Sequence, residues 1–83
     1  MREGIAATDS TGDFAIPSEV VNPNTGAIVA IRGIRDSSGY SGWHGFYYGS
    51  PNNDTFGFKA LTDNNSPLGN VTVHYRIYYI LFN

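Results

Sequence analysis

The sequence contains no cysteine and only two histidines, His44 and His74. Without cysteine, neither a disulfide nor a thiolate zinc site can stabilise the fold. This absence fits a reducing cytosol, and it also fits an exported protein that needs no disulfides. Two histidines are too few for a convincing metal cluster. We therefore expect no metal and no cofactor.

Charge is also scarce: 14% of the residues are charged, and the net charge is −2. The five basic residues are scattered along the chain, whereas nucleic-acid binding relies on a basic footprint. No apolar stretch approaches the roughly 20 residues that cross a bilayer as a helix. No basic segment followed by an apolar one opens the sequence as a secretory signal would. We expect a protein that binds no nucleic acid and does not insert into membranes.

Helical periodicity is nearly absent, because Gly and Pro interrupt most windows. Strand-like segments recur instead, at residues 13–16, 27–35, 43–48, 55–61 and 71–82. Clusters of Asn, Asp, Gly, Pro and Ser separate them. This spacing predicts an all-β fold, a small antiparallel sandwich or barrel of about five strands. Residues 1–12 are small and polar, and we interpret them as a linker or an extended, strand-like N-terminal arm before a single β domain of residues 13–83.

The chain has 83 residues, so it can form one domain with a marginal core. Domains of this size usually gain stability from disulfides, from a metal or from oligomerisation. With the first two excluded, we expect a homo-oligomer.

The last predicted strand changes character along its length. Alternation gives residues 71–81 one continuous apolar face, which should pack on the core. The opposite face is polar as far as Arg76 and then apolar at Tyr78, Ile80 and Phe82. Covering one such side chain is worth roughly 1.5–3 kcal/mol. We therefore place Tyr78, Ile80 and Phe82 at a subunit interface; the alternative is a core within one chain that folds over them.

The predicted strand at residues 27–35 is apolar on both faces as well. Strict alternation puts Val29 and Ile31 on one face and Ile28 and Ile34 on the other. We expect both faces to be buried.

The aromatic segment at residues 40–49 is the best candidate for recognition, because Tyr and Trp offer large, rigid contact surfaces with a polar group. Next to Gly and Ser, Tyr40 and Trp43 are expected to be exposed. The predicted ligand-binding residues, which would stack on a sugar and bind its hydroxyls, are Tyr40, Trp43, Tyr48, Asn52, Asn53 and Asp54. The alternative is that half of the aromatic residues belong to the core.

The sequence contains no recognisable catalytic motif. Residues 9–13 contain two aspartates around a glycine, but they lack the acidic spacing of a calcium loop and predict a turn. Neither His44 nor His74 has a Ser or Cys in a nucleophile setting. We expect no catalytic residue and no enzymatic activity.

Several features together resemble the C-terminal modules of bacteriophage tail fibres and tail spikes. They are the polar start, the β content rich in Gly, Asn, Ser, Thr and Tyr, the lack of cysteine, and the closing strand from Val71 to Ile80. The resemblance implies an intertwined homotrimer in the virion, made in the host cytoplasm, that recognises a bacterial surface glycan or an outer-membrane protein.

Two other functions stay open. One is a head-decorating or tail-connector protein of the phage, which would bind other virion proteins. The other is a stand-alone carbohydrate-binding domain.

Overall fold

The computed structural model describes residues 1–49 and 54–82, and this part of the chain contains six strands and no helix. The strands are β1 (Arg2–Ala7), β2 (Asp13–Ala15), β3 (Gly26–Asp36), β4 (His44–Gly49), β5 (Gly57–Leu61) and β6 (Thr72–Leu81). The all-β prediction is confirmed, with six strands instead of about five. Over the residues described, no helix is long and apolar enough to span a membrane.

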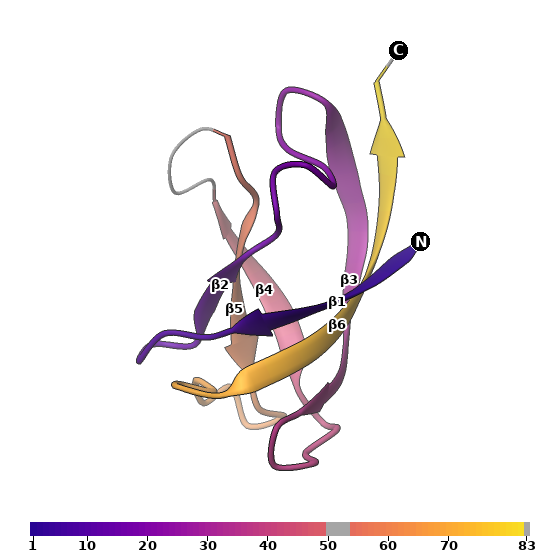
Figure 1. Ribbon diagram of the computed structural model, residues 1–83. Helices are drawn as coiled ribbons and strands as arrows, with labels where there is room; N and C mark the ends of the chain where they lie inside the picture. The colour runs from indigo at the N-terminus through magenta and orange to yellow at the C-terminus, as the bar shows by residue number, and fades with distance from the viewer. Residues whose placement is uncertain (50–53, 83) are drawn as a thin grey trace.

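Two three-stranded antiparallel sheets pack against each other as a small sandwich (Figure 1). The first sheet has the order β1-β6-β3, and the second has the order β2-β5-β4. The connections β1–β2 and β3–β4 both cross from the first sheet to the second. The last two strands, β5 and β6, are the central strands of their sheets.

Two turns of nearly the same sequence make these two crossings: DSTGD at residues 9–13 and DSSGY at residues 36–40. In the first, Oδ1 of Asp9 accepts hydrogen bonds from the Thr11 N–H (2.8 Å), the Thr11 hydroxyl (2.7 Å) and the Asp13 N–H (3.0 Å). The second turn repeats this pattern around Asp36. The glycine of each turn has a left-handed φ, 86° and 89° respectively, which a residue without a Cβ adopts at little cost.

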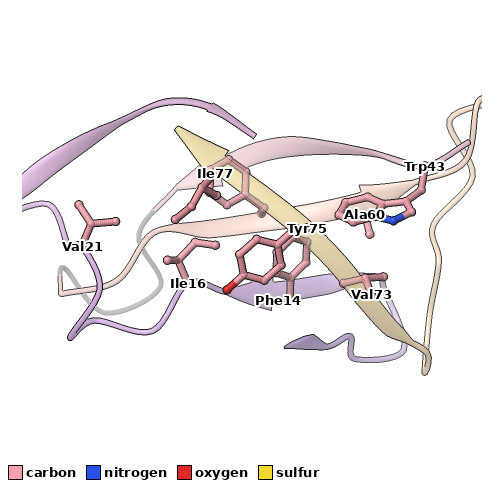
Figure 2. Close-up of a cluster of buried hydrophobic side chains, with 9 residues drawn as sticks. Phe14, Ile16, Val21, Trp43, Ala60, Val73, Tyr75 and Ile77 are labelled. Carbon is pink, nitrogen blue, oxygen red and sulfur yellow. The ribbon is translucent and has the colours of Figure 1, made fainter. Parts of the chain in front are cut away.

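The core lies between the sheets and is made of nine buried side chains (Figure 2): Phe14, Ile16, Val21, Trp43, Phe58, Ala60, Val73, Tyr75 and Ile77. The Phe14 ring is at its centre, edge-on to Trp43 at 6.0 Å and stacked on Tyr75 at 5.7 Å. Aromatic pairs in these arrangements contribute roughly 0.5–1.5 kcal/mol beyond the area they bury.

Strand β6 follows the predicted alternation over its first half. Val73, Tyr75 and Ile77 point into the core, and the residues between them do not. Tyr79 continues this face and packs against the core, but at Leu81 the expectation is wrong, because that side chain is 59% exposed.

Strand β3 contains two irregularities in its pairing with β6, one between Ile28 and Ala30 and one further along, between residues 33 and 35. An extra residue in a strand shifts the alternation of side chains beyond it. As a result, Ile28 and Ile31 both pack against the core, and Val29 is 68% exposed. The predictions that Val29 and Ile31 share a face and that both faces of this segment are buried are therefore wrong.

Residues 2–7, which we interpreted as part of a linker or arm, form an edge strand of the first sheet. Strand β1 pairs with β6 from Ala7 opposite Thr72 to Arg2 opposite Ile77. An ion pair joins the two strands, with Arg76 Nη2 2.6 Å from the Glu3 carboxylate. Since both side chains are partly exposed, water and salt screen this pair and it adds little stability.

Candidate functional site

A group of exposed, large apolar side chains lies at the end of the last strand, in residues 78–82, which we call the apolar tail. This segment contains no charged residue. The exposed fractions are 39% for Tyr78, 55% for Ile80, 59% for Leu81 and 57% for Phe82. The three residues predicted at a subunit interface therefore lie together and are accessible in the single chain.

Strands β1 and β3 cover different lengths of β6. Pairing with β1 ends at Arg2 opposite Ile77, whereas pairing with β3 continues to Gly26 opposite Leu81. Figure 1 shows the yellow end of β6 continuing past the start of β1 beside β3. Within the described residues, the tail thus has a strand neighbour on one side only.

An apolar groove of about 340 Å³ opens between β3 and the second sheet near this same end. Its lining consists of Ala27, Ile28, Val29, Ala30, Ile31, Gly45, Tyr47, Phe56 and Phe58. The β3 residues of the lining include those that pair with residues 78–80 of the tail. A Cβ at residue 45 would lie 3.0 Å from a methyl group of Ile31. Because Gly45 has no Cβ, Ile31 can lie close to the backbone of β4, and the floor of the groove is narrow. Tail and groove together form one apolar end of the sandwich.

The structure corrects the expectation that Trp43 is exposed. Its side chain is only 3% exposed, and its Nε1–H donates to the Arg35 carbonyl at 3.0 Å. Phe46, by contrast, faces solvent and is 59% exposed. An indole inside the core cannot present its face to a sugar.

The other predicted ligand-binding residues do not form one site. The Tyr40 hydroxyl donates to an Asp63 carboxylate oxygen (2.9 Å) and accepts from the Asp63 N–H (3.1 Å), beside a shallow polar hollow. Asp54 accepts from Asn24 Nδ2 at 3.3 Å, just before β3 begins. Because Tyr40 follows the end of β3, the eleven residues of that strand separate the two, a distance of roughly 35 Å.

Three of the predicted ligand-binding residues lie wholly or partly outside the part of the chain that the structure describes. The backbone of Tyr48 belongs to β4, but its side chain lies outside the described part, as do Asn52 and Asn53 entirely.

Two carboxylates have perturbed acidity for a structural reason. The Ser38 hydroxyl, at 2.6 Å, is the main cause that lowers the pKa of Asp36, aided by backbone N–H groups of the turn and opposed by burial. In the matching turn, the Thr11 hydroxyl is the main cause that lowers the pKa of Asp9. In each turn, one carboxylate oxygen accepts the hydrogen bonds that hold the turn together.

Within residues 1–49 and 54–82, neither histidine side chain forms a hydrogen bond or an ion pair. His44 is exposed at the start of β4, and His74 is half buried in β6, opposite Ile5 and Arg35. Among the residues described, no three His, Asp or Glu side chains gather as a metal site would require. What this part of the chain brings together is apolar surface.

Sequence reasoning located the apolar tail, but it missed the groove and the open edge of β6. The groove depends on the bulge at Val29 and on the small residue Gly45 opposite it, neither of which alternation alone reveals. No family model, no curated protein and no solved structure matches this chain. The function proposed for this chain therefore rests on its own exposed surfaces, the apolar tail and the groove.

Proposed function

We propose that this chain is a non-enzymatic structural module that works by self-association through its apolar tail. The observation that supports this is the exposure of Tyr78, Ile80, Leu81 and Phe82 in one uncharged segment. Covering these side chains favours association by roughly 1.5–3 kcal/mol for each one fully buried. In a domain with so small a core, the fold leaves these side chains exposed, and a second chain can cover them.

The setting we propose is a bacteriophage particle, with the module at the tip of a tail fibre or tail spike and a role in recognising the host surface. The support is the resemblance in composition and in the closing strand, together with an all-β fold whose apolar end suits assembly. Several copies would multiply weak contacts into useful avidity. The homotrimer that the resemblance implies stays a prediction.

A second candidate is a head-decorating or tail-connector protein of the phage. The same apolar tail and groove favour it, because both could contact another virion protein. A stand-alone carbohydrate-binding domain has less support, since Trp43 is buried and Tyr40 lies far from Asp54.

Sedimentation velocity between 1 and 500 µM, an order-of-magnitude range that spans weak to moderate affinities, tests the self-association. We expect the wild-type protein to associate and Ile80→Asp to be monomeric throughout. Ile5→Asp is the matched control, because Ile5 is as exposed (63%) but lies alone on the outer strand β1. A monomeric wild-type protein at the highest concentration would contradict the proposal.

Binding to bacterial surface polysaccharides and outer-membrane vesicles tests the host-recognition role. We expect the associated wild-type protein to bind and Ile80→Asp to lose most of its binding, because avidity is lost. Absence of binding by the associated wild-type protein would overturn host recognition and favour the virion-assembly role.

A further inference from the structure

Beyond Ile77, the edge of β6 that faces away from β3 has no strand partner among the described residues. The Phe82 N–H donates to the Thr25 carbonyl at 2.8 Å, so the backbone of residue 82 faces β3. In an antiparallel strand, successive residues direct their N–H and C=O to opposite neighbours. The N–H and C=O of Leu81 and of Tyr79 therefore point to the other edge, beyond Ile77, where pairing with β1 ends.

We propose that this edge pairs with the same edge of a second copy of the chain, so that two apolar tails form an antiparallel ladder about a two-fold axis. The inference rests on the proposed function and specifies its interface. A second copy is the fitting occupant because it carries an identical open edge of the same length. One contact then satisfies both edges, which is the property of a two-fold interface.

The apolar tail lacks the devices that protect edge strands from pairing. Edges are usually blocked by charged side chains, proline or bulges. The outer edge strand β3 has two bulges together with Arg32 and Arg35, and β1 carries Arg2 and Glu3. Residues 78–82 contain no charge and no proline, and they pair with β3 without a bulge in β6 itself.

The available area matches a small but specific interface. With roughly 150–250 Å² for each aromatic side chain and somewhat less for each aliphatic one, the exposed parts of Tyr78, Ile80, Leu81 and Phe82 amount to about 400 Å². Met1, which is 68% exposed and precedes the first paired residue of β1, adds about 100 Å² on the same scale. Complete cover of these side chains in two copies would bury at most about 1,000 Å², the lower limit for a biological interface. Edge pairing covers only part of that area, because the side chains stand on the two faces of the sheet, so a weak dimer is expected.

One register satisfies every open backbone group. If Tyr79 lies opposite Leu81 of the second copy, the four N–H and C=O groups of each tail edge find partners. Ile80 then lies opposite Ile80 of the second copy, as a non-hydrogen-bonded pair with Cα atoms roughly 4.5 Å apart. Pairing of this kind joins two chains, so it predicts a dimer as the basic unit and not the trimer that the resemblance implies.

Single cysteines test the register, since the chain has none of its own. Ile80→Cys should form an intermolecular disulfide rapidly under mild oxidation, because its Cα separation lies within the range of about 4.4–6.8 Å that disulfides span. Tyr78→Cys is the control on the same strand face. In the proposed register its two copies lie roughly 14 Å apart, so it should cross-link at least tenfold more slowly. Equal rates at both positions would overturn the two-fold register.

A proline tests the backbone edge separately from the side chains. Leu81→Pro removes an N–H that faces the open edge and spares the bonds to β3, a position where strands tolerate proline. We expect it to weaken dimerisation at least tenfold with the urea midpoint nearly unchanged, whereas Leu81→Ala, which keeps the N–H, should weaken it only a few-fold. If Leu81→Pro associates like wild type while Ile80→Asp is monomeric, the edge pairing is wrong and the proposed function stands. If wild type is monomeric, both fail.

Discussion

Gly33 of β3 lies directly against the indole of Trp43, so close that a Cβ at residue 33 would overlap both the ring and the Trp43 carbonyl. Gly33→Ala should therefore destabilise the protein by about 1–3 kcal/mol, as overpacking of a core does. Urea unfolding measures this. Gly45→Ala is the control, because its Cβ would meet a side-chain methyl of Ile31 at 3.0 Å, which can move aside. Equal stability of Gly33→Ala and wild type would contradict the packing described.

Trp43 is the only tryptophan, so its fluorescence reports its surroundings directly. Because it is buried, its emission should lie at short wavelength in the native protein and shift to longer wavelength on unfolding in urea. Trp43→Phe should lower the free energy of unfolding by about 2–3 kcal/mol, since it leaves the Arg35 carbonyl without its donor and removes buried volume. Native emission at the wavelength of free tryptophan would show that the indole is not buried.

Acid should weaken the turn around Asp36. Hydrogen bonds hold the pKa of Asp36 in the folded protein below its unfolded value of about 3.9. A lowered folded pKa means that the carboxylate stabilises the fold at neutral pH, and this contribution is lost as the pH falls from about 5 through the folded pKa. Asp36→Asn should cost about 1.5 kcal/mol at pH 7, the lower end of the range for hydrogen bonds to charged groups, and the difference from wild type should shrink below pH 4.

Urea midpoints of the two proteins between pH 2.5 and 7 test the acid effect, with the exposed Glu19→Gln as control. A difference between Asp36→Asn and wild type that stays constant across this range would rule out the carboxylate as its source.

Removing the Tyr40 hydroxyl should have a modest effect. It bridges the turn at residues 36–40 and the loop around Asp63 by two hydrogen bonds in a partly exposed setting. Tyr40→Phe should lower stability by about 0.5–1.5 kcal/mol. Tyr40→Phe and Asp63→Ala share the interaction, so their effects should not add in the double variant. Full additivity would show that the hydroxyl and the carboxylate act independently.

Much of the fold follows from local patterns. All five predicted strands are present, and most boundaries lie within two residues, because β-branched and aromatic runs alternate with turn residues. For residues 1–12 the sequence left a linker and a strand-like arm open, since Arg2–Ala7 has few apolar residues and owes its strand conformation to pairing with β6. The bulge at Val29 has no signature in a run of aliphatic residues. The two turns that connect the sheets do have a sequence signature, the repeated tetrapeptide Asp-Ser-Ser/Thr-Gly.

The sequence predicted the candidate site only where a pattern of apolar residues indicates which side chains must be covered. The tail was found because residues 78–82 are apolar on both faces, which one sheet cannot cover. The ligand-binding set was inferred from closeness in sequence, and tertiary packing overrode it. Trp43 entered the core because Gly33 leaves room for its ring, a contact between two segments that no local pattern records.

The position of β6 in the first sheet has a kinetic consequence. It is the last strand of the described chain, yet it is the strand to which both β1 and β3 pair, and Arg2 meets Ile77 across nearly the whole sequence. Contacts between such distant residues require a large loop to close before they yield any stabilisation, which slows folding. During synthesis, β1 and β3 must therefore wait unpaired for a strand made long after them, and folding within seconds, not microseconds, is expected once it arrives.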